Sequence, residues 1–231
     1  MIKAVLFDVD DTLLSFSGYV KETMREGFSR FGLTPYSDAM FPVFERINTA
    51  LWRQIELGSL TFEELTERRW NLIFQELGID FDGTVFETYF RERLFYSAVP
   101  EEGAVDLLAY LHRKYTLCVA SNGPWEQQMN RLRAGKMDRY FSYFFISSQI
   151  GAQKPDKAFF DGCFNVLRGA EFPGLGPEEV MIVGDSVSSD ISGGSDYGLR
   201  TCLYRKNAVP PCDHSGADYA VNSLAEIKNI L

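Results

Sequence analysis

Short apolar segments of four or five residues are the feature of this sequence that most constrains its fold. Four of them stand out at residues 4–7, 116–120, 180–183 and 201–204, with a fifth candidate at 144–147. Such runs, rich in Val, Ile, Leu and Phe, are typical of strands buried on both faces of a parallel sheet. Because segments with helical periodicity lie between several of them, the sequence predicts an α/β fold with an open, doubly wound parallel sheet.

The first interval between these strands is much longer than the others. Over one hundred residues separate Phe7 from Thr116, whereas a crossover between parallel strands needs only about a dozen. Within the interval, Thr61 and Glu64 form a capping-box pattern, and glycines close three helix-length segments at positions 32, 58 and 78. We therefore predict a helical bundle at residues 16–98, inserted into an α/β core made of residues 1–15 and 99–231.

One helix of the insert is expected over residues 62–77. Apolar side chains on this segment share one side of a 3.6-residue helix, so the insert can build a small core of its own. The residues expected on that side are Phe62, Leu65, Leu72, Ile73 and Leu77.

The composition limits the partners and the compartment. The 231 residues carry 23 Lys and Arg against 32 Asp and Glu, a formal net charge of −9, which disfavours binding to the phosphates of a nucleic-acid polymer. No stretch approaches the length of a membrane span, and the N-terminal apolar run is too short for a signal peptide. We therefore expect no membrane partner and a cytoplasmic location.

The four cysteines and two histidines give little support for a zinc site. No Cys-x-x-Cys pair occurs, and Cys118 and Cys202 fall inside apolar runs, so reduced and buried thiols are expected. Cys212 and His214 lie two residues apart without a second pair nearby, so a polar loop is expected there. Any metal is therefore expected to be a hard cation held by oxygen.

Acidic residues directly follow two of the predicted strands. Asp8, Asp10 and Asp11 lie within four residues after the first strand, and Asp185 and Asp190 follow the strand at 180–183. The carboxyl ends of the strands are where such sheets bind ligands, and an all-oxygen cluster suits Mg²⁺. A solvated loop or a helix cap is the alternative for any single aspartate, but the two clusters together predict a metal site.

Two further segments at strand or helix ends suit an anion. Ser121 and Asn122 end the second strand just before Pro124, which suits the start of a helix. A hydroxyl and unpaired backbone N–H groups at a helix start can receive a phosphate. Lys154 also precedes a predicted helix and could neutralise a bound anion. Taken singly, a serine cap and an exposed lysine are the simpler interpretations.

These four segments, in this order, resemble the motifs of the haloacid dehalogenase superfamily of phosphohydrolases, and the resemblance covers nearly the whole chain. The first motif, Asp-x-Asp-x-Thr, is matched by Asp8, Asp10 and Thr12. The second, third and fourth motifs are matched by Ser121, Lys154, Asp185 and Asp190. The helical insert after the first motif resembles the cap domain of the C1 branch.

The resemblance implies a Mg²⁺-dependent phosphomonoesterase. Asp8 would be the nucleophile that forms an aspartyl-phosphate, Asp10 the general acid and base, and Lys154 a further catalytic residue. The implied metal ligands are Asp8, Asp10 through its carbonyl, Asp185 and Asp190. The residues implied to contact the phosphate are Thr12, Ser121, Asn122 and Lys154. Members that displace halide lack an acid at the position of Asp10, which argues against dehalogenase activity.

Part of the insert is similar to that of pyrimidine 5'-nucleotidases. The matching segments are Ile47-Asn48-x-x-Leu51-Trp52, Glu56-x-Gly58 and Arg69-Trp70. This similarity implies nucleoside 5'-monophosphates as substrates. A sugar-phosphate phosphatase, such as a sialic-acid phosphatase, and a phosphomutase are alternatives, and a non-catalytic phosphate-binding module stays open, as does the oligomeric state.

Selectivity is expected to come from the cap. The cap residues that could contact a base or sugar are Trp52, Arg69, Tyr89 and Phe90. Packing in the core of the helical bundle is the alternative for each of these side chains.

Overall fold

The computed structural model describes residues 1–206 and 216–231. Cys212 and His214, for which a polar loop is expected, lie outside the described residues. The chain divides into two compact units: unit 1 comprises Met1–Ser15 and Ala98–Leu231, and unit 2 comprises Phe16–Ser97. Residue 98 therefore belongs to unit 1, whereas the sequence-based expectation placed it in the helical insert.

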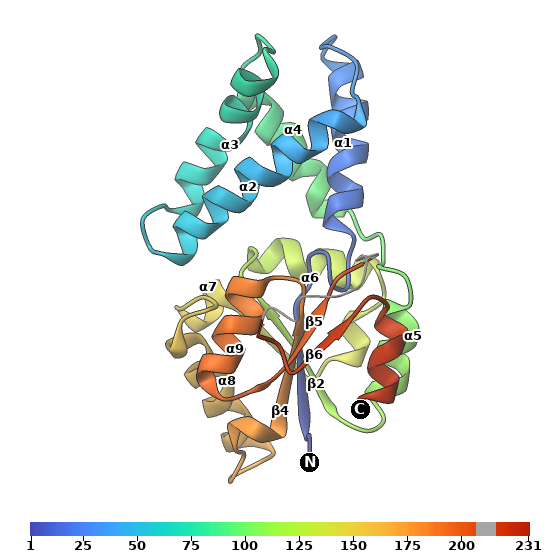
Figure 1. The fold of residues 1–231 in the computed structure, drawn as a ribbon, viewed down its shortest axis with the longest axis vertical. Helices are drawn as coiled ribbons and strands as arrows, with labels where there is room; N and C mark the ends of the chain where they lie inside the picture. Colours follow the sequence, from blue (N-terminus) through green and yellow to red (C-terminus); the bar gives the residue numbers. More distant parts are fainter. Residues whose placement is uncertain (207–215) are drawn as a thin grey trace. The chain divides into compact units, whose positions relative to one another are not determined.

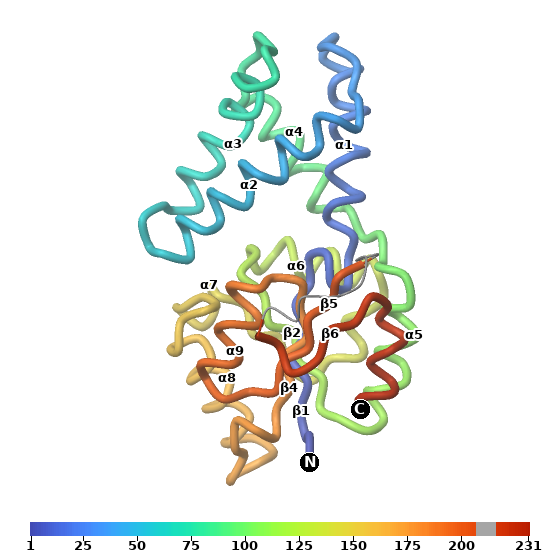
Figure 2. Tube along the Cα trace, viewed as in Figure 1, coloured from blue at the N-terminus to red at the C-terminus, as the bar shows by residue number. Residues whose placement is uncertain are grey.

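Unit 1 contains, among the described residues, a six-stranded sheet in which every neighbouring pair is parallel (Figure 1). The strands are β1 (Ala4–Phe7), β2 (Thr116–Ser121), β3 (Tyr143–Ile146), β4 (Val180–Gly184), β5 (Arg200–Tyr204) and β6 (Tyr219–Val221). Their order is β3-β2-β1-β4-β5-β6, so β1 lies between β2 and β4. In Figure 2, β1 is the blue segment that follows the N-terminus. All five apolar segments form strands, which confirms the doubly wound α/β fold. Strand β6, which is only three residues long, was not predicted from the sequence.

Helices cover both faces of this sheet. The longer ones are α5 (Ala104–Leu111), α6 (Trp125–Ala134) and α8 (Lys157–Ala170). The shorter helices and turns are η2 (Asp138–Tyr140), α7 (Ser147–Ile150), η3 (Pro177–Glu179), the π-helical turn η4 (Val187–Ser192), α9 (Gly193–Tyr197) and η5 (Leu224–Asn229).

The side chains of β1 explain why its sequence is continuously apolar. Val5 and Phe7 belong to one hydrophobic cluster with residues of α5 and α6, while Ala4 and Leu6 belong to a second cluster with residues of α8. Successive side chains of a strand point to opposite faces. Because both faces are covered, all four residues are fully buried and none can be polar without a buried partner.

The two segments that join the units lie side by side within unit 1. The Ser15 N–H donates to the Val99 carbonyl at 2.9 Å. One residue further into the core on each segment, Leu14 and Pro100 form an antiparallel bridge. The chain therefore leaves unit 1 and returns to it at adjacent points.

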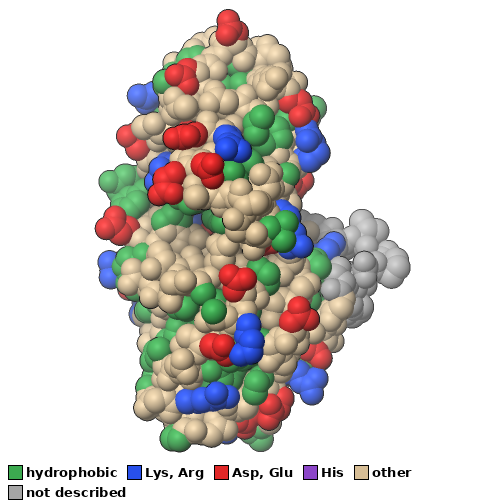
Figure 3. Space-filling view, turned by 90° about the vertical axis from the view of Figure 1, so that its left-hand side faces the viewer, with side chains coloured by type: hydrophobic (Ala, Val, Ile, Leu, Met, Phe, Trp, Pro, Cys, Tyr) green, Lys and Arg blue, Asp and Glu red, His purple; other side chains and the backbone are tan. Residues whose placement is uncertain are grey.

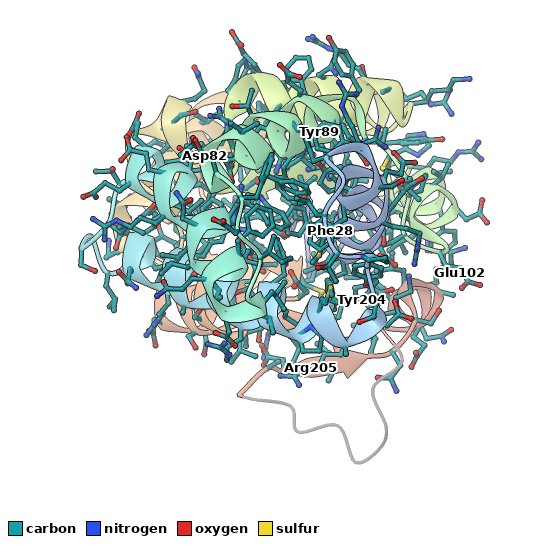
Figure 4. All side chains as sticks on the ribbon, turned by 90° about the horizontal axis from the view of Figure 1, so that it is seen from above. Phe28, Asp82, Tyr89, Glu102, Tyr204 and Arg205 are labelled. Atoms are coloured by element: carbon teal, nitrogen blue, oxygen red, sulfur yellow. The ribbon has the colours of Figure 1, made fainter. Side chains whose placement is uncertain are left out.

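Unit 2 is a bundle of helices with an aromatic core. Its elements are α1 (Phe16–Arg30), η1 (Asp38–Met40), α2 (Phe41–Glu56), α3 (Phe62–Leu77) and α4 (Gly83–Tyr96). Helix α3 packs against α2 and α4, and α1 packs against α4. Phe28 of α1 is fully buried inside this unit (Figure 4). The other large aromatic side chains that are fully buried here are Phe44, Trp70, Phe74, Phe86 and Phe90. Each buried Phe contributes about 1.5–3 kcal/mol.

The predicted helix boundaries in unit 2 are confirmed at the ends of α2 and α3. At the start of α3, the Glu64 N–H donates to Thr61 Oγ1 at 3.1 Å, and the Thr61 N–H donates to Glu64 Oε2 at 2.8 Å. Gly58 and Gly78 close α2 and α3 with φ of 68° and 66°, a left-handed conformation that glycine adopts without steric cost.

The expected apolar face of α3 is wrong at Leu72. That side chain is 40% exposed, whereas Leu65, Trp70, Ile73 and Phe74 are buried. Trp70 and Phe74 lie four residues apart and place the largest side chains toward the core, which rotates Leu72 toward solvent. The periodicity identified the helix, but it selected a face that is displaced from the observed one.

The surface shows no single dominant charge on the face in Figure 3, where Lys and Arg side chains are scattered among Asp and Glu. Within residues 1–206 and 216–231, no helix has both the length and the apolar character needed to cross a bilayer.

Candidate active site

Three carboxylates meet at the carboxyl edge of the sheet in unit 1. Strands β1 and β4 are parallel neighbours with Phe7 opposite Val183, and the Asp8 N–H donates to the Val183 carbonyl at 2.9 Å. Asp8 and Asp185 therefore leave the sheet from neighbouring strands at the same edge. One carboxylate oxygen from each of Asp8, Asp185 and Asp190 lies within 4.8 Å of the other two.

Asp190 reaches this cluster because β4 ends in glycine. A Cβ at position 184 would lie 2.1 Å from Asp190 Oδ2, so any other residue at Gly184 would displace the carboxylate. Asp190 is fully buried, and Oδ2 accepts a hydrogen bond from the Ser186 N–H at 3.1 Å. Gly184 therefore makes room for a buried acid at the end of β4.

Lys154 supplies the positive charge of the cluster. Its ammonium group donates to Asp8 Oδ1 at 2.8 Å, to Asp190 Oδ1 at 2.6 Å and to the Ala120 carbonyl at 2.6 Å, so each of its three protons has a partner. The side chain is 1% exposed. Burial acts to lower the pKa of Lys154, but the charges of Asp190 and Asp8 outweigh it and raise the pKa above its usual value.

The residues expected to contact phosphate divide into two groups. Ser121 is buried at the end of β2, and Thr12 is buried with its hydroxyl 3.5 Å from Asp185 Oδ1, so both lie at this edge. The side chain of Asn122 binds the backbone of Lys154, and a contact of Asn122 with phosphate stays a prediction. Its Nδ2 donates to the Lys154 carbonyl at 2.8 Å, and its Oδ1 accepts from the Lys154 N–H at 2.9 Å. The Asn122 amide therefore fixes the lysine loop.

Two residues of α6 that were not predicted from the sequence also contact the residues of this site. Arg131 Nη1 donates to Asp10 Oδ1 at 2.6 Å, and Gln128 Nε2 donates to Asp10 Oδ2 at 2.7 Å. Gln128 Nε2 also donates to Ser121 Oγ at 3.0 Å. The available signal was a Gln and an Arg three residues apart on the helix that follows Ser121, on one face of that helix.

The acidic cluster raises the pKa of two of its members. Burial, together with the charges of Asp190 and Asp10, raises the pKa of Asp8 from 3.8 to about 7, although Lys154 acts in the opposite direction. The pKa of Asp185 is also raised well above its usual value, by loss of hydration and by the charges of Asp8 and Asp190, even though the residue keeps exposed surface. The raised pKa values show that the negative charges of this cluster are not fully balanced by Lys154, so a further positive charge would stabilise it.

The residues of the cluster fit a divalent cation. Asp8, Asp185 and Asp190 carry three formal negative charges when ionised, and Lys154 offsets one of them, so two remain. The donors are carboxylate oxygens, which Mg²⁺ prefers over nitrogen or sulfur. Lys154 pairs with Asp8 and Asp190, which leaves Asp185 as the carboxylate most in need of a cation.

Replacing Asp8 with asparagine is expected to stabilise the metal-free protein near pH 8 and to change its stability less near pH 5. Because the pKa of Asp8 rises to about 7 in the folded state, its protonated form favours folding at low pH, and this contribution is lost as the pH rises through about 7. Asparagine does not titrate. The variant's advantage in free energy of unfolding should therefore grow by about 2–3 kcal/mol between the two pH values. Thermal unfolding in EDTA measures this change, and a pH-independent difference would contradict it.

Two of the cap residues proposed from the sequence lie in the core of unit 2. Arg69 is 4% exposed, and its guanidinium donates to both carboxylate oxygens of Glu87, at 3.0 and 2.5 Å, and to Asn48 Oδ1 at 3.0 Å. Phe90 is fully buried, with the Arg69 guanidinium 4.7 Å from its ring centre. These two side chains pack in the core of the bundle, which is the alternative given for them above. We therefore do not assign them to substrate.

The other two cap residues keep partial exposure. Trp52 is half-buried and its ring centre lies 5.9 Å from that of Phe62. Tyr89 is also half-buried, with its ring centre 5.5 Å from that of Phe31, and Figure 4 labels it. Contact with a base or sugar remains a prediction for Trp52 and Tyr89.

Comparison with known proteins identifies the family. A sequence model of the haloacid dehalogenase-like hydrolases matches residues 2–198, so the chain belongs to this family and is a hydrolase, as its motifs predict. It is 31% identical to the HAD-hydrolase YfnB of Bacillus subtilis over 229 residues, 99% of this chain and 95% of YfnB. A solved structure of YfnB bound to magnesium matches with a TM-score of 0.86, covering 100% of this chain and 98% of that one.

Two further relatives carry named activities. The chain is 30% identical to the pyrimidine 5'-nucleotidase PynA of Streptococcus pneumoniae over 238 residues, covering 99% of this chain and 97% of PynA. It is 24% identical to the N-acylneuraminate-9-phosphatase of Homo sapiens over 239 residues, covering 100% of this chain and 94% of that protein.

Proposed function

We propose that this protein is a Mg²⁺-dependent phosphomonoesterase that forms an aspartyl-phosphate on Asp8 and acts on nucleoside 5'-monophosphates, pyrimidine nucleotides in particular. The observation that carries the proposal is the pairing of Asp8 with Lys154 at 2.8 Å beside two further carboxylates. A carboxylate held this way can attack phosphorus while positive charge offsets the phosphate. Asp8, Asp185 and the backbone carbonyl of Asp10 would hold Mg²⁺, which when bound neutralises phosphate charge.

The proposed reaction has two steps. In the first, an Asp8 oxygen forms a bond to phosphorus and the ester P–O bond breaks, while Asp10 gives a proton to the departing alkoxide. In the second, water forms a bond to phosphorus, its proton passes to Asp10, and the Asp8–phosphorus bond breaks. Inorganic phosphate leaves and both carboxyl groups return to their starting state. Lys154 lies within hydrogen-bond distance of Asp8 and offsets negative charge in both steps.

The choice of substrate is supported by overall sequence similarity to relatives with named activities. PynA is 30% identical along almost its whole length, and a pyrimidine nucleotide is therefore the first substrate to test. The sugar-phosphate alternative is supported by the similarity to N-acylneuraminate-9-phosphatase, at 24% identity. Asp10 supports an ester rather than a halide as leaving group, because a departing alkoxide needs a proton.

A phosphate-release screen tests the function. The full-length protein with Mg²⁺ is offered uridine, cytidine, thymidine, adenosine and guanosine 5'-monophosphates, together with hexose phosphates and N-acylneuraminate 9-phosphate. We expect kcat/KM to be highest for a pyrimidine nucleotide. A preference for a sugar phosphate would contradict the proposed substrate but would still support phosphatase activity. Mg²⁺ binding without phosphate release from any compound would instead support a binding module.

Removal of the metal is expected to reduce turnover by about 100-fold or more, because two uncompensated negative charges would then oppose the incoming phosphate. The measurement is phosphate release after dialysis against EDTA, followed by titration with Mg²⁺. Activity should return with Mg²⁺ and return less with Ca²⁺, which is larger and accepts a looser arrangement of oxygens. Full activity in EDTA would remove the metal from the proposal.

We also propose a cytoplasmic location. The described cysteines, Cys118, Cys163 and Cys202, are buried free thiols, as a reducing compartment permits. Burial raises the pKa of Cys118 and of Cys163 well above the usual value, so both thiols stay protonated and unreactive near neutral pH.

A further inference from the structure

Both oxygens of the Asp10 carboxylate are held by one helix. Arg131 Nη1 donates to Oδ1 at 2.6 Å and Gln128 Nε2 donates to Oδ2 at 2.7 Å. The two α6 side chains are also joined to each other, because Arg131 Nη1 donates to Gln128 Oε1 at 3.0 Å. Asp10 itself follows β1 and lies in no helix, so these bonds connect it to a rigid element of the core.

We propose that Gln128 and Arg131 are positioning residues that hold the Asp10 carboxyl in place for proton transfer to the leaving group and from water. The inference rests on the proposed function, since it needs Asp10 to be the acid and base. It adds two residues on α6, outside the four motifs, whose effect reaches substrate only through Asp10.

The surroundings of Gln128 and Arg131 suit such a role. Gln128 is 0% and Arg131 1% exposed, so their side chains have little freedom and the order they impose on Asp10 costs little further entropy. The Asp10 side chain is 33% exposed, so it alone of the three faces solvent. A buried arginine and amide that end on a partly exposed carboxylate can fix it from behind and leave its front open.

Gln128 also ties Asp10 to the residue that ends β2. The second proton of its Nε2 goes to Ser121 Oγ at 3.0 Å, and the same oxygen accepts from the Gly123 N–H at 3.1 Å. A Cβ at Gly123 would lie 2.4 Å from Gln128 Nε2, so glycine there permits this approach. One amide therefore sets the spacing between the proposed acid and the proposed phosphate-binding hydroxyl.

The dependence of kcat/KM on the leaving group distinguishes a positioning role of Gln128 and Arg131 from a purely structural one. An alkyl phosphate such as a nucleoside 5'-monophosphate needs a proton on its departing oxygen, whereas p-nitrophenolate leaves as a stable anion without one. Loss of Asp10 positioning should therefore lower kcat/KM for the alkyl phosphate and spare kcat/KM for p-nitrophenyl phosphate. The second step needs a base with either substrate, so kcat for p-nitrophenyl phosphate should fall and phosphoenzyme should accumulate.

The experiment compares Gln128→Met and Arg131→Met with wild type on p-nitrophenyl phosphate and on the alkyl phosphate that the screen ranks first. In Arg131→Met we expect kcat/KM for the alkyl phosphate to fall at least about 30-fold, within the range that general acid–base catalysis supplies, and kcat/KM for p-nitrophenyl phosphate to fall less than about threefold. Gln128→Met also releases Ser121, so the same selective loss should be accompanied by a smaller loss that both substrates share. A burst of p-nitrophenolate should precede the slow steady state. Arg131→Lys, which keeps a cationic donor, should recover part of the loss.

Arg133→Met is the matched control, because Arg133 lies on the same helix but is exposed, and it should behave as wild type. Asp10→Asn should show the same pattern as Arg131→Met, and adding Arg131→Met to it should cause no further selective loss. Equal losses on both substrates, or an unchanged ratio between them, would overturn the inference. If a methionine variant unfolds early, the ratio measured for Arg131→Lys decides.

The same assays separate this inference from the proposed function. If wild type hydrolyses neither substrate, or Asp8→Asn keeps turnover, the proposed function fails. If wild type is active and Asp8→Asn is not, while the ratio stays constant in the α6 variants, only the positioning role fails.

Discussion

Without the Asp8 carboxylate, hydrolysis of phosphate monoesters is expected to fall by about 10⁴-fold or more, the scale seen when a catalytic nucleophile is removed. Asparagine keeps the shape of the side chain and its contact with the Lys154 ammonium, so binding should persist while bond formation to phosphorus stops. The measurement is phosphate release by Asp8→Asn, together with trapping of 32P-labelled enzyme by acid quench. Wild type should carry acid-stable label and the variant none.

Two results would contradict this expectation. Turnover within about tenfold of wild type by freshly purified variant would mean that Asp8 is not the nucleophile. Label on the variant would place the phosphoryl group on another residue. Deamidation back to aspartate is detected by mass spectrometry and distinguished by activity that grows with storage time.

Replacing Lys154 with methionine is expected to reduce both stability and activity. Asp8 and Asp190 would lose their buried counter-charge, and removal of one partner from such an arrangement costs about 3–5 kcal/mol. kcat/KM should fall at least about tenfold, or 1.4 kcal/mol, because a positive charge beside the phosphate is lost. Denaturant unfolding and phosphate release measure the two effects.

Lys157→Met is the control for this variant. Lys157 lies three residues further on, its side chain is 77% exposed, and it pairs with Asp161 on its own helix. Such a surface pair contributes about 0.3–0.5 kcal/mol, so the control should remain close to wild type in stability and turnover. A stability loss for Lys154→Met no larger than that of the control would show that the cluster does not depend on this charge.

The main chemical groups of the site could be predicted because topology brings them together. Asp8 and Asp185 each follow a buried strand, and parallel neighbours end at one edge of the sheet. Lys154 was harder to place, because a lysine before a helix is usually exposed. Its burial and its three partners follow from the Asn122 contact with its backbone, which links two loops 32 residues apart.

The positions of several residues depend on tertiary packing, and sequence patterns did not predict them. Gln128 and Arg131 occupy the buried face of α6, and their polarity gave no apolar periodicity to detect. Arg69 was a candidate substrate contact because a cap side chain of this kind could hydrogen-bond a base or sugar, yet Glu87 and Asn48 satisfy its guanidinium inside the bundle. Leu72 fits the helical pattern of apolar residues but is exposed, because the larger side chains of Trp70 and Phe74 occupy the core.

The hydrogen bond between Ser15 and Val99 bears on how such a chain can change over time. This bond joins the two ends of the segment Phe16–Ser97 within unit 1. The pairing of the strands in the sheet therefore does not depend on the residues of that segment. Substitutions or length changes within Phe16–Ser97 can then accumulate while the aspartates and the lysine of unit 1 keep their spacing. The inserted stretch is thereby free to diversify without disturbing the carboxylate cluster.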